Sequence, residues 1–205
     1  MSQINVVLCT AACLVGLLAA LVVVGRFASL TTRKLTVIAL LTAVYVVLSI
    51  VGTLNLWWIR ISVDSLPIIL GALLYGPAGG LLVGLLGSFM NQLLTYGLTA
   101  TTALWVIPAA VRGALIGAYA KKHGYEFSRA QVIGVLVATA VVVTALNTGV
   151  MYLDSVINGY YSYAYVFGGV VIRVISGAAT AVVMAFVAPP VIELLHRSLR
   201  SARRA

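Results

Sequence analysis

Two arginines lie inside apolar stretches of this sequence and give the first sign of a binding site. Arg112 and Arg173 each stand in a run that is long and apolar enough to cross a membrane. An arginine at the centre of a membrane helix costs about 2.5–3.5 kcal/mol. The four acids of the chain fall in loops or near the ends of the runs: Asp64, Glu126, Asp154 and Glu193. We therefore expect a ligand that supplies anionic or carbonyl acceptors.

Polar residues recur at helical spacing in four successive runs. Positions i, i+3, i+4 and i+7 share one face of a helix, so each run presents one polar stripe. The stripes are Ser88, Asn91, Gln92 and Thr95; Trp105, Pro108, Ala109 and Arg112; Thr144, Asn147, Thr148 and Met151; and Gly169, Arg173, Ser176 and Thr180. The predicted substrate-binding residues are Asn91, Gln92, Trp105, Arg112, Asn147 and Arg173. The alternative is that the uncharged ones join helices, for about 0.6 kcal/mol each.

Residue sets that carry catalysis are missing. His123 and His196 stand in a loop and in the C-terminal tail, and neither belongs to a Ser/His/Asp or metal-ligand cluster. There is no glycine-rich phosphate loop of the GxxxxGK[ST] type. The runs also lack the intramembrane carboxylate or histidine that proton-coupled transporters use. We predict no enzyme activity, no cofactor and no metal site.

The composition is that of an integral membrane protein. Of the 205 residues 62% are hydrophobic and 8% are charged, whereas a soluble domain has about 25% charged residues. A transmembrane helix needs roughly 20 apolar residues, so the length allows six or seven crossings and almost no soluble domain. The net charge of +9 comes from short basic loops, which set topology, and no nucleic-acid partner is expected.

The apolar runs define the expected elements. They cover residues 4–25, 35–51, 66–75, 78–96, 102–120, 130–152 and 166–187, with a turn at Gly76-Pro77 between the third and the fourth. We predict an all-α membrane protein with an additional N-terminal transmembrane helix in residues 1–30. Residues 31–195 then form a six-helix substrate-binding domain, and residues 196–205 form a basic tail.

The basic residues predict the orientation. Ten of the 13 Lys and Arg residues fall in residues 26–34, 121–129 and the tail from Arg197. Cytoplasmic loops are enriched in Lys and Arg, so these segments and the C-terminus are expected to be cytoplasmic. Asn91, Asn147 and Arg173 then lie in the outer half of the membrane and Arg112 near its midplane. This placement predicts a pocket that is loaded from outside.

The loop from Leu54 to Asp64 is expected on the same outer side. It contains Trp57, Trp58, Arg60 and Asp64. Tryptophans commonly anchor a protein at the membrane–water interface. A loop of this polarity beside an outward-facing pocket is equally well interpreted as a lid.

Three segments of the sequence resemble a known family. They are TTRKLTVIALLTAVYVV from Thr31, RISVDSLPIILGALLYGPAGGLLVGLLG from Arg60, and VRGALIGAY from Val111. In this order they resemble the substrate-binding S component of an energy-coupling factor (ECF) vitamin transporter, and most closely the folate-type group. The resemblance covers roughly residues 31–195 and implies a six-helix bundle in the cell membrane that captures a vitamin from outside.

The resemblance also implies partners. An S component docks on a membrane-embedded T component that carries two cytoplasmic ATPases. It implies that the first loop closes the pocket, and that Ala39 and Ala43 lie on the docking surface. The favoured ligands are hydrogen-bonding carboxylated solutes such as folate or pantothenate; cobalamin, a pyridoxine-like vitamin or a queuosine precursor stay open.

Two other functions stay open besides the transport-binding subunit. One is a membrane enzyme that acts on a phosphorylated lipid or isoprenoid and uses Arg112 and Arg173 to hold phosphate. The other is a small-solute importer or channel that works alone.

Overall fold

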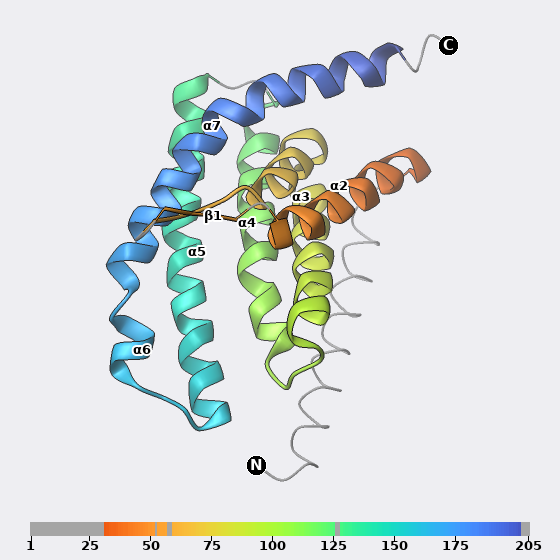
Figure 1. Cartoon of the computed structure of the whole chain (residues 1–205). Helices are drawn as coiled ribbons and strands as arrows, with labels where there is room; N and C mark the ends of the chain where they lie inside the picture. The colour runs from red at the N-terminus through yellow and green to blue at the C-terminus, as the bar shows by residue number, and fades with distance from the viewer. Residues whose placement is uncertain (1–30, 52, 57–58, 126–127, 202–205) are drawn as a thin grey trace.

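Long helices make up most of the structure (Figure 1). The computed structural model describes residues 31–51, 53–56, 59–125 and 128–201. Its elements are α2 (Thr32–Val51), β1 (Thr53–Leu56), β2 (Ile59–Ser62), α3 (Ser65–Tyr96), α4 (Thr102–Lys122), α5 (Arg129–Asn158), α6 (Tyr163–Phe167) and α7 (Val170–Ser201). Five helical segments in the described residues are long and apolar enough to cross a membrane. A helical membrane fold is thereby confirmed, whereas the count of six helices plus one is not, and residues 1–30 lie outside the described residues.

Helix α3 bends sharply at Gly76. The φ of this residue is 72° and its ψ is −156°, a conformation that favours glycine because a Cβ would clash. Pro77 follows and donates no backbone hydrogen bond. The predicted turn is confirmed, and the expected runs 66–75 and 78–96 are the two halves of α3. These halves lie against each other, since a Cβ built on Gly71 would stand 2.9 Å from Val83 Cγ2.

The second half of α3 packs on α4 through residues without bulk. A Cβ on Gly80 would stand 2.4 Å from Gly113 O, and one on Gly84 would stand 2.3 Å from Ala109 O. A Cβ on Gly113 would come within 2.0 Å of Gly80 O. Small residues four apart let two helix backbones approach closely in a membrane. This packing brings the backbones of α3 and α4 into close contact.

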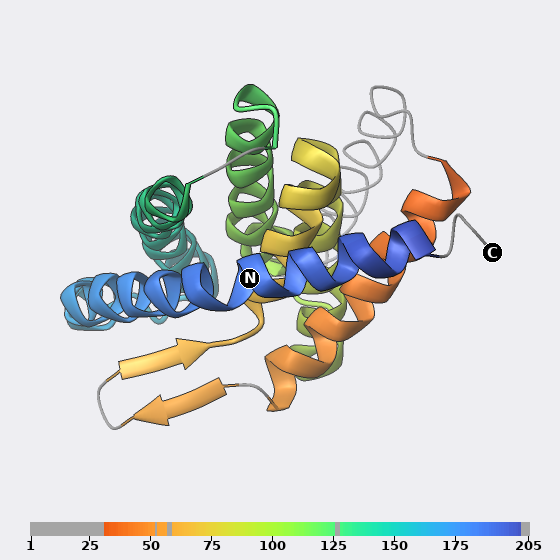
Figure 2. The same ribbon diagram turned by 90° about the horizontal axis from the view of Figure 1, so that it is seen from above.

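The predicted loop 54–64 contains a β-hairpin, which is a correction to the sequence analysis. Strands β1 and β2 pair antiparallel, with Asn55 opposite Arg60. The sequence of these strands alternates apolar and polar residues over two short segments, as half-buried strands do. Figure 2 shows the hairpin beside α7, on the side away from α5. Trp57 and Trp58 fall between the strands and lie outside the described residues.

Helix α5 has clear signals at both ends. Ser128 Oγ accepts a hydrogen bond from the Gln131 backbone N–H at 3.3 Å, and the Ser128 N–H donates to Gln131 Oε1 at 2.9 Å. This reciprocal pair is a capping box, which satisfies N–H groups that a helix start leaves open. At the other end Gly159 has a φ of 78° and closes the helix in the left-handed conformation.

A buried carboxylate joins α5 to the loop before α4. Asp154 is only 8% exposed. It accepts hydrogen bonds from Thr101, from Tyr160 and, at 3.0 Å, from Asn158. The hydrogen bond to Asp154 raises the pKa of the Tyr160 hydroxyl above its usual range. This group of hydrogen bonds connects α5 and α4 at the end opposite the basic loop.

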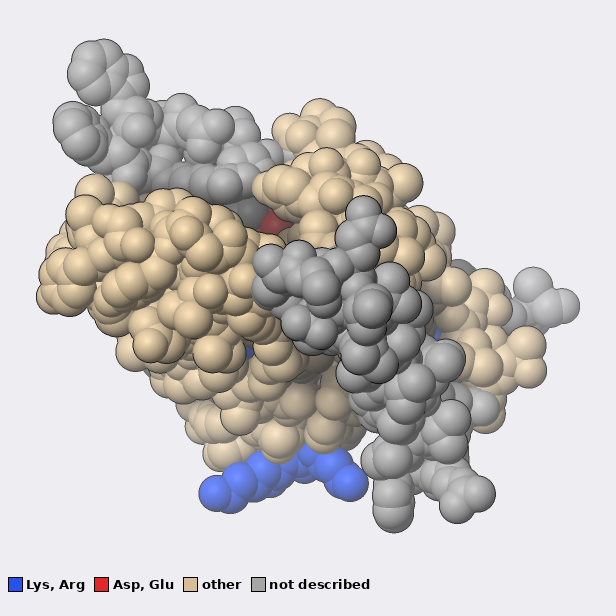
Figure 3. Space-filling view, turned by 90° about the horizontal axis from the view of Figure 1, so that it is seen from below, with Lys and Arg blue, Asp and Glu red and all other residues tan. Residues whose placement is uncertain are grey.

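The described helices form two groups with an apolar interior. Helices α2, α3 and α4 pack together, and α5 packs on α7. One core cluster lies where α3, α4, α5 and α7 meet, and it includes Ala72, Ile116, Leu136 and Met184. Figure 3 shows a face where the described atoms are almost all uncharged, with Lys and Arg at one edge. The helices also expose many large apolar side chains, which suits contact with lipid.

Candidate substrate-binding site

A cavity of about 390 Å³ lies between the two groups of helices. One wall comes from α2, α3 and α4, and the opposite wall comes from α5 and α7. Its polar and aromatic lining residues are Tyr45, Asp64, Ser65, Ser88, Trp105, Arg112, Thr139, Thr144, Asn147, Arg173, Ser176 and Thr180. Apolar side chains, such as Ile68, Ile116 and Val143, form the rest of the wall. Binding sites for small molecules are usually of this size and composition.

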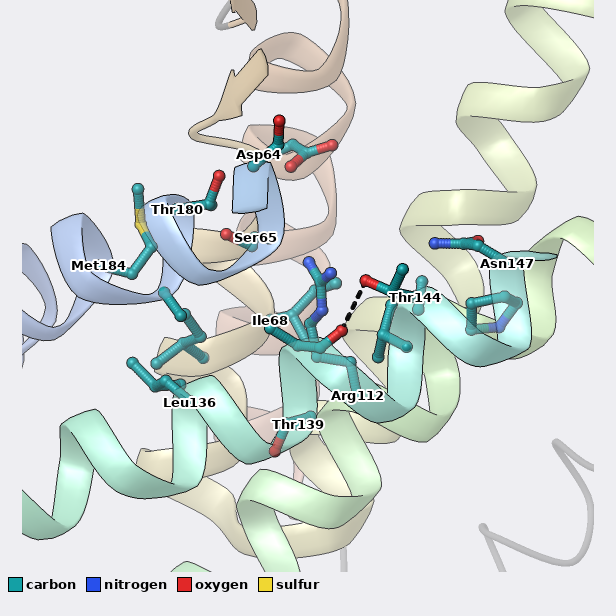
Figure 4. A pocket seen from close by; sticks show the side chains of 18 of the residues that line it. Asp64, Ser65, Ile68, Arg112, Leu136, Thr139, Thr144, Asn147, Thr180 and Met184 are labelled. Carbon is teal, nitrogen blue, oxygen red and sulfur yellow. Dashed lines mark hydrogen bonds between the residues drawn. The ribbon is translucent and has the colours of Figure 1, made fainter. Parts of the chain in front are cut away.

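Helix α4 presents its whole predicted stripe to the cavity. Trp105, Pro108, Ala109 and Arg112 all line it. In Figure 4 the guanidinium group of Arg112 points into the cavity, between Ser65 of α3 and Thr144 of α5. Within the described residues Arg112 makes no hydrogen bond or ion pair. Its donors therefore face the space that a ligand would occupy.

Arg173 lines the same cavity but is held by the protein itself. Its Nε donates to the carbonyl oxygen of Gly169 at 3.3 Å. Its two terminal nitrogens contact Val166 O and the sulfur of Met151. Carbonyl acceptors at a helix end are a favourable setting for a cation. Arg173 thus joins α7 to α6 and α5, and its charge has acceptors before any ligand arrives.

Helix α5 supplies hydroxyl and amide groups. Thr139 donates to Val135 O at 2.6 Å, and Thr144 donates to Ala140 O at 2.8 Å, the bond drawn in Figure 4. Each hydroxyl oxygen keeps lone pairs that can accept a hydrogen bond. Asn147 lies one turn further along the same face and also lines the cavity.

Asn91 and Gln92 do not line the cavity. Asn91 Oδ1 accepts hydrogen bonds from Ser49 of α2 at 2.8 Å and from Thr95 at 3.3 Å. Only Ser88 of this stripe reaches the cavity, where its hydroxyl donates to Trp105 O at 3.3 Å. The geometry around Asn91 is that of a contact between helices. Of the six predicted binding residues, the structure brings together Trp105, Arg112, Asn147 and Arg173.

Several lining residues were not singled out in the sequence. Tyr45 of α2, 6% exposed, lines the cavity on the same wall as Ser88. A Cβ on Gly87 would stand 2.5 Å from its ring, so this glycine makes room for Tyr45. Ser65 and Thr139 also line the cavity. A hydroxyl within an apolar run was the available signal for Tyr45 and Thr139, whereas nothing in the sequence marked Ser65.

The predicted lid and docking residues lie in different places. Asp64 lines the cavity just before α3 begins, and Arg60 is on β2. Ala39 and Ala43 are both exposed on α2, one turn apart. They are accordingly not used for packing within the described part of the chain.

A comparison with protein families now adds to this geometry. The model of the family described as ECF-type riboflavin transporter, S component, matches residues 29–196. The chain belongs to this family. It is therefore a substrate-specific subunit of ECF transporters and a multi-pass membrane protein, and a transport subunit agrees with the expectation of no enzyme activity. No curated protein matches the sequence. The folate-type subgroup expected for this S component is not confirmed, because the matching family is the riboflavin type.

Proposed function

We propose that this S component binds riboflavin, or a vitamin of closely similar shape, in the cavity between the two helix groups. Two findings together support this proposal. The chain belongs to a riboflavin-transporter family, and a cavity of about 390 Å³ with polar lining lies inside the matched residues.

The lining of the cavity suits both parts of such a ligand. Riboflavin has a flat ring system and a chain of hydroxyl groups. Trp105 and apolar side chains such as Ile68 and Val143 offer faces for a flat ring. Thr144, Asn147 and Ser176 lie on the wall formed by α5 and α7 and can exchange hydrogen bonds with hydroxyl groups.

Folate is the second candidate, and Arg112 is the observation that favours it. A guanidinium group binds a carboxylate through two parallel hydrogen bonds. The family model that matches the chain is of the riboflavin type, however, and we therefore place folate after riboflavin.

Delivery of the ligand would depend on partners. We infer that Ala39 and Ala43 meet a T component with two ATPases, because both residues are exposed and a helix can approach closely there. By the positive-inside rule we expect the C-terminus to be cytoplasmic. A lid made by Trp57, Trp58, Arg60 and Asp64 stays a prediction from the resemblance to S components.

The test is to purify the protein from cells grown in rich medium and to identify the bound small molecule by mass spectrometry. Calorimetric titration with riboflavin, folate and pantothenate then ranks the three. We expect riboflavin to co-purify and to bind most tightly. Folate as the bound molecule would move the assignment to the second candidate. Turnover of a phosphorylated lipid, or uptake by the chain alone, would support the enzyme or the lone transporter instead.

A further inference from the structure

Arg112 differs from the other cavity arginine in what surrounds its charged group. Arg173 donates to Gly169 O and Val166 O and contacts the Met151 sulfur. Arg112 has no hydrogen-bond partner in the described part of the chain, and it points into the cavity (Figure 4). Water can solvate its donors while the cavity is empty. A ligand that displaces this water must supply acceptors, because an unsatisfied charged donor is costly.

The shape of the guanidinium group restricts these acceptors. Its N–H groups form a rigid planar fork that matches two adjacent acceptor atoms in one plane. A carboxylate or a phosphate provides such a pair, and so does a heterocycle with a ring nitrogen beside a carbonyl oxygen. Arginine reads guanine in DNA through a pair of the second kind.

The aromatic and apolar side chains beside Arg112 favour a flat heterocycle. Trp105 lies two turns earlier on the same face of α4, and Ile116 lies one turn later. A flat ring that rests along this face would carry its polar edge to Arg112.

We propose that Arg112 is the specificity-determining residue that reads the edge of the ligand's ring where a ring nitrogen stands next to a carbonyl oxygen. This inference rests on the proposed function and narrows it. The ring of the ligand lies along α4, and its hydroxylated chain extends toward Asn147 and Ser176. Fused heterocycles that lack this acceptor pair should bind weakly, because they would leave the guanidinium group of Arg112 without acceptors.

The experiment pairs changes in the ligand with changes in the protein. In 5-deazariboflavin and 1-deazariboflavin a C–H replaces one ring nitrogen beside a carbonyl. The dissociation constants of riboflavin and of both analogues are measured by calorimetry on wild-type protein, Arg112→Met and Arg112→Lys. Lys122→Met serves as the matched control, because Lys122 is an exposed basic residue at the end of the same helix.

For wild-type protein we expect at least one analogue to bind tenfold or more weakly than riboflavin. In Arg112→Met riboflavin itself should bind at least tenfold more weakly, and the analogue should lose nothing further. Arg112→Lys keeps the charge without the planar fork, so it should also fail to distinguish riboflavin from the analogue. Lys122→Met should behave as wild type.

Three results would overturn the inference, and they can be told apart. If wild-type protein binds riboflavin and both analogues equally well, Arg112 does not recognise the ring nitrogen, although the proposed function stands. If Arg112→Lys still binds riboflavin more tightly than the analogue, another residue recognises the ring nitrogen. Wild-type protein that does not bind riboflavin at all removes the proposed function and this inference together. If Arg112→Met does not fold, the wild-type and Arg112→Lys titrations still decide.

Discussion

At the scale of single residues, the role of a charged side chain in a membrane protein depends on the atoms around it. Both cavity arginines look alike in the sequence, since each stands in an apolar run without an acid. The structure separates them. Arg173 donates to the carbonyl oxygens of Val166 in α6 and of Gly169, whereas Arg112 keeps its donors directed at the cavity. The two residues should therefore respond differently to substitution.

We expect Arg173→Gln to lower the thermal stability and Arg112→Gln to leave it almost unchanged. Loss of a hydrogen bond that involves a charged group costs about 1.5–3 kcal/mol. Of the two arginines, Arg173 alone makes such bonds within the described residues. Thermal unfolding of both variants in detergent, without ligand, measures the difference. Equal unfolding temperatures would show that the contacts of Arg173 contribute nothing.

A second residue-scale prediction concerns the bond between Ser49 and Asn91 at 2.8 Å. Asn91→Leu and Ser49→Ala should each cost about 0.6 kcal/mol of stability. The double variant should cost less than the sum, because both remove the same bond. Ligand affinity should stay at the wild-type value in all three. A tenfold loss of ligand affinity in Asn91→Leu alone would show that Asn91 contributes to ligand binding after all.

At the scale of elements, close helix packing depends on glycines that have no room for a side chain. A Cβ on Gly113 would stand 2.0 Å from the Gly80 carbonyl oxygen, whereas a Cβ on Gly134 of α5 would meet nothing within 4 Å. The same substitution should thus have opposite consequences at the two sites.

Gly113→Ala should force α3 and α4 apart and disturb the cavity wall that carries Trp105 and Arg112. We expect a loss of several kcal/mol of stability and a severe loss of ligand binding. Gly134→Ala is the control, and it should be neutral or gain up to about 1 kcal/mol from helix propensity. Yield after purification, thermal unfolding and calorimetry test the pair. A Gly113→Ala protein with wild-type stability would contradict the close approach.

The hairpin gives a prediction that uses the three tryptophans of the chain. A variant with Trp57→Phe and Trp58→Phe retains Trp105 in the cavity wall, so riboflavin should quench most of its emission. A Trp105→Phe variant reports only on residues 57 and 58. If the hairpin closes on the ligand, the emission of this second variant should shift to shorter wavelength on binding. Emission that does not change with saturating riboflavin would argue against a moving lid.

Some of this architecture could be predicted from the sequence because it depends on local signals. The turn at Gly76-Pro77 and the polar face of α4 follow from residue type and helical spacing. The face of α3 shows the limit of this approach. Spacing places Ser88 and Asn91 in one stripe, but it does not say that Asn91 lies level with Ser49 on α2. The hairpin was missed because its strands have only four residues each.

At the scale of the whole molecule, two groups of helices enclose the cavity, and Ala39 and Ala43 of α2 are exposed in the described part of the chain. Ala39→Trp and Ala43→Trp should leave ligand affinity intact and abolish uptake in cells that express the complete transporter. Val141→Trp, at a 51% exposed position on α5, is the matched control and should keep uptake. Calorimetry on purified protein and uptake of labelled riboflavin are measured side by side. Loss of affinity together with uptake would place the two alanines inside the packed protein.

The bend in α3 also bears on how the chain enters the membrane during synthesis. Residues 65–75, before the bend, rise only about 16 Å at 1.5 Å per residue, which is roughly half of the hydrocarbon thickness. This segment is too short to be inserted by the translocon as a separate span. Gly71 and Val83 show that it lies against the second half of α3. We therefore expect the two halves of α3 to enter the membrane together as a helical hairpin, after the residues that follow Pro77 have left the ribosome.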